Sequence, residues 1–302
     1  MLKASSVLGN SQRLDGGAMF GNAPRALWTR WAAPDAAGRV ALACRALMIE
    51  DGSRRVLFET GIGTFFAPEL RERYGVVETE HVLLASLAEL GTSHREVDVV
   101  VLSHLHFDHA GGLLAPFRVD QSPELLFPRA QFVVSKTAFE RAERPHLRDR
   151  ASYIPELPDL LRRSGRLHLV DAASDLSSIL GARVRFVETQ GHTPGMIHAR
   201  VVGERARLFF AADLVPGVAW VHLPITMGYD RFPEQLVDEK AELFRDLIAH
   251  EEFLYFTHDP MVAAARLREE TLRFHPSHEL GAFRGWDLDS AALPAATVST
   301  SP

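Results

Sequence analysis

The sequence is poor in the features that mark secreted or membrane-spanning proteins. It contains one cysteine, Cys44, which cannot form an internal disulfide and lies in an apolar run where a small buried thiol is expected. The first 17 residues lack the continuous apolar stretch of a signal peptide, and no later run approaches the roughly 18–20 apolar residues that span a bilayer. These absences predict a cytoplasmic protein without a membrane partner.

An excess of basic residues is also lacking. The chain has 33 Lys and Arg against 39 Asp and Glu, a formal net charge of -6, which gives no general attraction to phosphate backbones. Nucleic acid is therefore not expected as a partner, and a small molecule is the expected substrate.

The length and composition are those of a chain with a large core. It has 302 residues, of which 46% are hydrophobic, and no repeat or internal boundary divides it, so we predict a single domain over residues 1–302. Residues 1–38 are expected to form an N-terminal extension that lines the site or makes a dimer contact, and their apolar character is compatible with a homodimer. Residues 290–302 predict a loose tail.

Apolar periodicity predicts many strands and a few helices. Residues 39–59 read as a hairpin around a turn at 50–52, and residues 81–90 as a helix that ends at Gly91. Further strands are predicted at residues 97–102, 131–134, 166–170, 184–188, 197–202, 208–211 and 253–256, and helices at 232–250 and 261–273. Residues 140–163, rich in Arg and interrupted by prolines, predict a surface excursion or a lid.

The strongest chemical signal follows the strand predicted at 97–102. It reads His104-Leu105-His106-Phe107-Asp108-His109, with glycines at 111 and 112. Alternation in an extended segment puts His104 and His106 on one side, where they can meet one metal ion, and the following turn redirects Asp108 and His109 toward a second. A lone histidine is more often a hydrogen-bonded core or surface residue. Burying three imidazoles with a carboxylate, however, is costly unless a cation binds them. Ser103 and Asp108 are also candidate caps of a helix that begins here.

This motif resembles the HxHxDH signature of the metallo-β-lactamase-fold hydrolases. Three further motifs occur in that family's order, each after an apolar strand: Thr189-Gln190-Gly191-His192-Thr193-Pro194-Gly195, Leu208-Phe209-Phe210-Ala211-Ala212-Asp213 and Tyr255-Phe256-Thr257-His258-Asp259. The resemblance implies an α+β fold, a four-layer αββα sandwich.

The resemblance also implies a dinuclear site. His104, His106 and His192 would bind one ion, Asp108, His109 and His258 the other, and Asp213 would bridge both together with a hydroxide. Nitrogen and carboxylate ligands suit zinc, which we favour, and also manganese, iron or cobalt. Two such divalent ions activate a shared water for hydrolysis, and Asp108 can accept a hydrogen bond from that water. Glu59, where the family commonly has aspartate, is a candidate for orienting a ligand.

Several segments are similar to the branch of quorum-quenching lactonases and methyl-parathion-type hydrolases. They are Leu14 to Gly21, Trp28, Ala212 to Pro216 and Met227 to Asp230. This implies opening of a lactone or similar ester, with an acyl-homoserine-lactone-like substrate as one candidate. The tyrosine that this branch has shortly after the bridging aspartate is absent at Val215 and Pro216. We therefore take Tyr229 as its candidate substitute beside catalytic Asp108 and Asp213, the alternative being a loop aromatic without a role. Candidate substrate contacts are Met19, Phe20, Trp28, Phe65 and His222.

Other chemistries stay open on the same fold. They are an iron-dependent redox enzyme and a phosphotriester or thioester hydrolase. The redox alternative is weakened because di-iron members usually have a glutamate where this chain has His106. A nuclease is disfavoured because the chain has no additional nucleic-acid-binding domain and no basic surplus.

Overall fold

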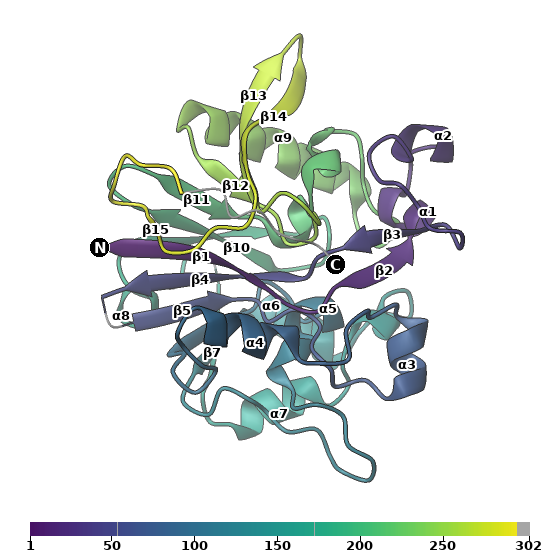
Figure 1. Cartoon of the computed structure of the whole chain (residues 1–302), viewed down its shortest axis with the longest axis vertical. Coiled ribbons are helices and arrows are strands. Elements are labelled where there is room, and N and C mark those ends of the chain that lie inside the picture. Colours follow the sequence, from purple (N-terminus) through teal and green to yellow (C-terminus); the bar gives the residue numbers. More distant parts are fainter. Residues whose placement is uncertain (53, 172, 295–302) are drawn as a thin grey trace.

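Two β-sheets stack face to face in the middle of the structure, and helices cover their outer sides (Figure 1). The computed structural model describes residues 1–52, 54–171 and 173–294. The first sheet has the order β15-β1-β4-β5-β6-β7-β8, with strands Trp286–Asp287, Leu2–Leu8, Arg45–Asp51, Arg54–Phe58, Val99–Val101, Gln131–Ser135 and Leu167–Val170. The second has the order β14-β13-β12-β11-β10-β9, with strands Arg273–Leu280, Ala264–Glu270, Phe253–Tyr255, Arg207–Phe210, Met196–Val202 and Val184–Thr189. Strands β2 (Gln12–Asp15) and β3 (Arg39–Leu42) form a separate pair.

The helices lie on the outer faces and in the loops. They are α1 (Gly16–Phe20), α2 (Arg25–Trp28), α3 (Pro68–Arg73), α4 (Val82–Glu89), α5 (Phe107–Ala110), α6 (Lys136–Glu143), α7 (Leu157–Arg163), α8 (Ser177–Leu180) and α9 (Pro233–Ala249). Short 3-10 turns are η1 (Gly111–Leu113), η2 (Arg150–Ser152), η3 (Ala212–Leu214) and η4 (Val218–Val221).

Alternation along the central strands explains the layers. In β4, Leu47 and Ile49 pack into the cluster between the two sheets, whereas Ala46 and Met48 pack into the cluster under the helices. Successive side chains of a strand point to opposite faces, so an all-apolar strand needs cover on both sides. The second cluster includes Leu83 of α4 and Phe139 of α6, which supply that cover. The predicted four-layer αββα sandwich, an α+β fold, is confirmed.

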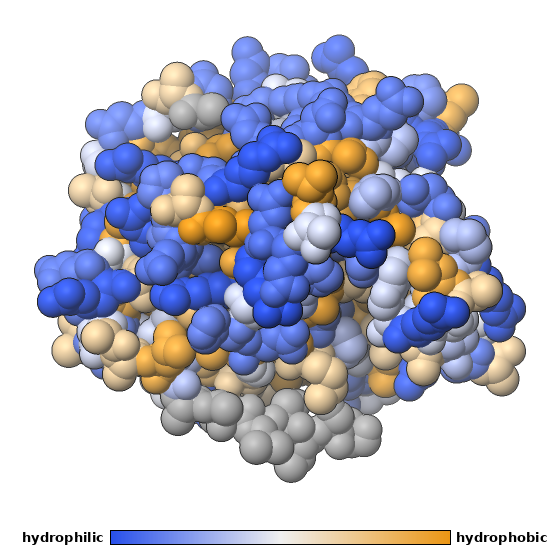
Figure 2. Space-filling model, turned by 90° about the horizontal axis from the view of Figure 1, so that it is seen from above, coloured by the Kyte–Doolittle hydropathy of each residue, from blue (hydrophilic) through white to orange (hydrophobic). Residues whose placement is uncertain are grey.

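Helix α9 covers the second sheet with one apolar stripe. Leu236, Leu243, Phe244 and Leu247 are buried, and the Phe244 ring lies 5.2 Å from that of Phe274 on β14. Apolar residues at this spacing fall on one helix face. The face seen in Figure 2, viewed from above Figure 1, is mostly hydrophilic, with hydrophobic side chains in separate groups.

Most predicted elements are confirmed, but the helix expected at 261–273 is wrong. The segment forms β13 and the start of β14, which pair as an antiparallel hairpin. Its composition favours a helix, yet β13 completes the sheet by pairing Ala265 with Leu254 of β12. Thr271 and Leu272 both have positive φ at the tip of the hairpin. Pairing with strands on both sides therefore overrides local helix propensity here.

The expected surface excursion at 140–163 is also more ordered than its prolines indicate. It contains the end of α6, then η2 and α7, and Ile154, Leu157 and Leu161 are buried against the first sheet. This segment is a packed part of the helical layer, and its Tyr153 reaches the candidate site.

The N-terminal residues are part of the main fold. The expectation of an extension over residues 1–38 is incomplete, because β1 is an interior strand that pairs with both β4 and β15. A dimer contact by residues 1–38 stays a prediction. Of the tail expected at 290–302, residues 295–302 lie outside the described residues. Within the described ranges, none of the helices has the length and apolarity required for a bilayer span.

Candidate metal centre

The seven predicted ligands converge at one edge of the sandwich. His104, Asp213 and His258 each follow the end of a strand, β6, β11 and β12 respectively, and His192 follows β9. Strands β11 and β12 run parallel, as do β5, β6 and β7, so their carboxyl ends meet at the same edge. The fold therefore collects residues from 104 to 258 into one site.

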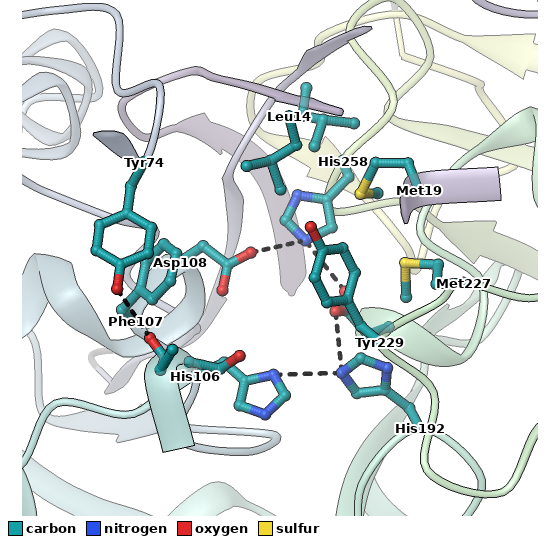
Figure 3. Close-up of a pocket in the computed structure, with 14 residues that line it drawn as sticks. Leu14, Met19, Tyr74, His106, Phe107, Asp108, His192, Met227, Tyr229 and His258 are labelled. Carbon is teal, nitrogen blue, oxygen red and sulfur yellow. Dashed lines mark hydrogen bonds and ion pairs between the residues drawn. The ribbon is translucent and has the colours of Figure 1, made fainter. Parts of the chain in front are cut away.

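One ligand set contains His104, His106, His192 and Asp213. One ligand atom from each lies within 4.8 Å of the others. His192 Nε2 is 3.3 Å from His106 Nδ1 and 3.3 Å from Asp213 Oδ2 (Figure 3). Three buried imidazoles and one carboxylate oxygen thus face a common point.

The second set contains Asp108, His109 and His258. The Nε2 atoms of His109 and His258 are 3.2 Å apart, and Asp108 Oδ2 lies 3.8 and 3.7 Å from them. Asp213 Oδ1 is 3.2 Å from His109 Nε2 and 3.1 Å from His258 Nε2. The two oxygens of Asp213 therefore face different sets, which is the arrangement of a bridging carboxylate.

Hydrogen bonds on the far side of the rings orient them. His192 Nδ1 lies 2.8 Å from Asp230 Oδ1, and His258 Nδ1 lies 2.7 Å from the carbonyl oxygen of Ala43. Because both partners are acceptors, each Nδ1 carries the proton and each Nε2 offers a lone pair to the site. The inward nitrogen of His104, Nε2, is buried with no hydrogen-bond partner among the described residues. Lone pairs that face one another at this distance repel unless a cation lies between them, so the residues fit a metal pair.

The charges of the site agree with that fit. Burial, together with the neighbouring imidazoles, lowers the pKa of His104 and His106 well below the ordinary histidine value, so both are neutral ligands. Burial would raise the pKa of Asp213, but the surrounding histidines hold it well below its usual range. Although burial opposes it, Asp213 raises the pKa of His109 to about 9. An anion that attracts positive charge from several sides is suited to divalent cations.

Glu59 lies behind the second set. Its Oε1 accepts a hydrogen bond from Ser103 N at 2.9 Å, and its Oε2 is 3.8 Å from His109 Nδ1. Burial raises the pKa of Glu59 to about 7, and its φ of 65° lies in the left-handed region that non-glycine residues seldom occupy. Its position suits the predicted role of orienting His109, which stays a prediction.

The loop that carries the motif packs tightly against residues 60–63. A Cβ atom at Gly112 would lie 2.0 Å from the carbonyl oxygen of Thr60, so only glycine fits there.

The prediction that Ser103 and Asp108 cap the following helix is wrong. Helix α5 begins after His106 without a side-chain cap, and the Ser103 hydroxyl lies 2.8 Å from His104 Nδ1 instead.

A cavity of about 130 Å³ opens onto the ligand sets. It is lined by Leu14, Met19, Leu42, Tyr74, His106, Phe107, Asp108, Ala151, Ser152, His192, Asp213, Met227, Tyr229 and His258. Tyr229 is 38% exposed and stands at the pocket in Figure 3, while Asp108 is the least buried of the seven ligands. The cavity therefore combines an apolar wall with two oxygen-bearing side chains beside the ligand sets. We call it the reactive pocket.

Of the five candidate substrate contacts, Met19 lines the reactive pocket and the other four do not. Phe20 stacks between Trp28 and Trp220, with ring centroids 5.6 and 4.7 Å away, and Trp28 is buried. The Phe65 ring lies 4.1 Å from Phe66, and the His222 ring lies 4.8 Å from Trp31. These four residues therefore lie outside the reactive pocket, Phe20 and His222 line a second cavity, and contact of the four with substrate stays a prediction.

Sequence reasoning missed residues that complete the site. Asp230 binds the His192 ring, Tyr74 lines the reactive pocket, and Tyr153 lies against the His106 ring with centroids 4.8 Å apart. Asp230 directly follows Tyr229, so its place beside a candidate catalytic residue was an available signal. Tyr153 lies in the proline-rich segment, where no periodic pattern indicated its direction.

The fold and the paired ligand sets define a protein built to hold metal ions at the edge of an αββα sandwich. Residues 39–258 match the metallo-beta-lactamase superfamily, and the chain belongs to this superfamily. The predicted resemblance is confirmed.

Several known proteins are similar over most of the chain. One from Mycobacterium tuberculosis, named as a probable metallo-hydrolase, is 28% identical over 245 residues, which cover 73% of each chain. The solved structure of a probable metal-dependent hydrolase from Staphylococcus aureus has a TM-score of 0.79 at 23% identity, covering 88% of this chain and 92% of that one. AidC, described as a dizinc quorum-quenching lactonase, has a TM-score of 0.73 at 18% identity, covering 91% and 93%. The structural likenesses show the shared fold, and the superfamily with its hydrolase-named relatives supports a metal-dependent hydrolase.

Proposed function

We propose that this chain opens a lactone or a similar carboxylic ester by using two divalent metal ions. The observation that carries the proposal is the position of Asp213, whose two oxygens lie 3.1–3.3 Å from imidazole nitrogens of both ligand sets. One set would be His104, His106 and His192, the other Asp108, His109 and His258, with zinc as the favoured ion and manganese, iron or cobalt as alternatives. Held by these residues, two such ions would supply an activated water near neutral pH and polarisation of the carbonyl under attack.

Asp108 is proposed to handle the proton. Its carboxylate lines the reactive pocket and is only half-buried, so it can face both a ligand set and the substrate. Attack by the water oxygen forms a new C–O bond at the carbonyl carbon, and collapse of the resulting tetrahedral intermediate breaks the ester C–O bond and releases an alkoxide. Asp108 can accept the proton of the attacking water and return it to the leaving oxygen.

Tyr229 is proposed to donate a hydrogen bond to the oxygen on which negative charge develops. Burial raises the pKa of its phenol, and the charge of Asp108 acts in the same direction, so the hydroxyl keeps its proton. A protonated phenol at the pocket can take the place of the tyrosine that this chain lacks at Val215 and Pro216.

The lining of the reactive pocket supports an uncharged substrate. Leu14, Met19, Leu42 and Met227 form its apolar wall, which favours an apolar substituent and excludes bulk water from the reaction. Structural neighbours named as lactonases include AidC and an N-acyl homoserine lactone hydrolase, the latter with a TM-score of 0.62. The proposal needs a small molecule as substrate and neither nucleic acid nor a membrane. The cytoplasmic location and the homodimer stay predictions.

The test is a substrate panel on metal-loaded protein. Lactones, carboxylic esters, thioesters, phosphotriesters and phosphodiesters are compared by kcat/KM, and oxygen uptake is followed with an iron-loaded sample and a thiol. The proposal predicts the highest kcat/KM for a lactone or carboxylic ester. A preference for phosphotriesters or thioesters, or turnover that consumes oxygen, would overturn it in favour of that chemistry.

Tyr229→Phe tests the proposed donor. We expect kcat to fall roughly 100-fold, because one hydrogen bond to the developing charge is lost, with the metal content unchanged. Tyr74→Phe is the comparison, since the Tyr74 hydroxyl already donates to Ala151 O at 3.3 Å and its loss should cost less. Equal kcat values for Tyr229→Phe and the wild type would remove Tyr229 from the reaction.

A further inference from the structure

A second cavity, of about 440 Å³, lies next to the reactive pocket. It is lined by Phe20 of α1, by residues that follow α2, by β3, by η4, by residues 258–262 and by the start of β14. Most of its wall is apolar, and the residues used below are Phe20, Trp31, Val40, Ala219 and Trp220. We call it the rear cavity.

Stacked rings make the wall of the rear cavity rigid. Phe20 and Trp220 stack with centroids 4.7 Å apart, and Trp31 stacks on His222 at 4.8 Å. The Trp220 indole donates a buried hydrogen bond of 3.1 Å to Met19 O. Rings held in this way keep a binding site formed before a ligand arrives.

The titratable residues that line the rear cavity are Asp259 and the histidines His222, His258 and His275. Asp259 Oδ2 accepts from Val218 N at 3.0 Å, and its Oδ1 accepts from the backbone N–H groups of Met261 and Val262 at 3.0 and 2.8 Å. These three backbone donors hold the Asp259 carboxylate in place, and the rest of the wall is mainly apolar. The chemistry of the wall therefore suits an aliphatic chain.

Leu42 and His258 line both cavities. Leu42 and Val40 lie on one face of β3, and the consecutive residues Met19 and Phe20 of α1 line the reactive pocket and the rear cavity respectively. The side chains of Leu42 and Met19 thus stand at the boundary, directly beside the ligand sets.

The volumes of the two cavities indicate which part of a substrate each cavity can hold. The reactive pocket, at about 130 Å³, is smaller than the roughly 300 Å³ at which sites for whole small-molecule ligands begin, whereas the rear cavity, at about 440 Å³, is within that range. Resting on the proposed function, we infer that the substrate carries a long unbranched apolar substituent. Its ester or lactone group reacts in the reactive pocket while the chain passes Leu42 into the rear cavity.

A second copy of the chain or another protein is a less suitable occupant of the rear cavity. Figure 2 shows hydrophobic side chains only in separate groups on the face above the second sheet, without a broad apolar area. Protein interfaces of ordinary stability need roughly 800 Å² per partner. A cavity lined by rings and directly beside the ligand sets fits a chain-like small molecule better.

The experiment compares γ-valerolactone and γ-dodecalactone as substrates, and measures 1-decanol binding by the fluorescence of Trp31 and Trp220. Each methylene that enters the rear cavity is expected to raise kcat/KM about fourfold until the cavity is full. Ala219→Phe fills the cavity, so it should remove most of this gain and weaken decanol binding at least tenfold while the short lactone keeps its kcat/KM. Ala241→Phe, at a half-buried alanine of α9 that lines neither cavity, is the control, and Ala32→Phe is the second filling variant if Ala219→Phe does not fold.

The outcomes separate this inference from the proposed function. If the protein binds decanol, loses that binding in Ala219→Phe and hydrolyses no ester, the apolar-chain site is supported and the proposed function is refuted. Hydrolysis with equal kcat/KM for both lactones, or a chain-length gain that survives both filling variants, overturns the rear-cavity inference and leaves the proposed function standing.

Discussion

At the scale of single residues, hydrogen bonds on the far side of the rings fix how His192 and His258 face the ligand sets. Asp230 binds His192 Nδ1 at 2.8 Å and also accepts from Met227 N at 2.6 Å. The backbone N–H of Met227, in the same loop as Asp230, thus holds the carboxylate in place. Partners of this kind set the tautomer and the direction of a metal ligand.

Asp230→Ala tests that role directly. Loss of the carboxylate frees the His192 ring, and we expect metal affinity to fall by about 10- to 100-fold in titrations against a competing chelator. Asp230→Asn, which keeps an acceptor oxygen, should lose less. Asp238→Ala, at an exposed position on α9, is the control, and wild-type affinity in Asp230→Ala would show that the hydrogen bond is irrelevant to metal binding.

His198 predicts a pH dependence of stability. It is buried, its Nε2 lies 2.8 Å from Thr189 Oγ1, and burial lowers its pKa to about 4. Between the unfolded pKa near 6.5 and the folded value, the unfolded chain binds more protons, so stability falls as the pH falls through this window. Urea unfolding at pH 7 and pH 5 should show the wild type losing about 2 kcal/mol more than His198→Gln. The exposed His278→Gln serves as the control, and parallel losses in wild type and His198→Gln would refute the assignment.

At the scale of elements, the ligand positions could be predicted because short strands lead directly into polar motifs. Strands β6, β9, β11 and β12 each precede a predicted ligand, and the positions of β6, β11 and β12 follow from short apolar runs. The hairpin β13–β14 could not be predicted in this way, because residues 261–273 contain strong helix formers and no continuous apolar run marks their pairing with β12 and β14. Tertiary pairing decides such segments.

Helix α9 holds the loop that carries Tyr229 and Asp230 through a buried lysine. Lys240 is fully buried, and its Nζ donates to the carbonyl oxygens of His222, Leu223 and Ile225 at 3.3, 3.2 and 2.9 Å. No sequence pattern indicated this contact, since a lysine on a helix is ordinarily a solvated residue.

Lys240→Met removes the donor but keeps an unbranched side chain that is one heavy atom shorter. Three buried carbonyl groups lose a partner, so we expect the free energy of unfolding to fall by about 1–3 kcal/mol in chemical denaturation. Lys136→Met, at a side chain 71% exposed on α6, should change it little. An unaltered unfolding free energy in Lys240→Met would mean that water replaces the ammonium without cost.

At the scale of the whole molecule, the ligand set was predictable while the pocket was not. The seven ligands follow strand ends in the order of the family, and the topology brings them together. Phe20, Trp28, Phe65 and His222 have the right composition for a substrate wall, but their placement depends on ring stacking between distant segments, which no local pattern encodes. Contacts across the core can be assigned only once the layers are known.

The central claim is that one chain holds two metal ions joined by Asp213. The most direct measurement is the metal content per chain by mass spectrometry after zinc loading and removal of free metal. The account predicts two equivalents for the wild type and clearly fewer than two for Asp213→Asn, with unchanged circular dichroism. One equivalent or less in the wild type, or two retained by Asp213→Asn, would contradict it.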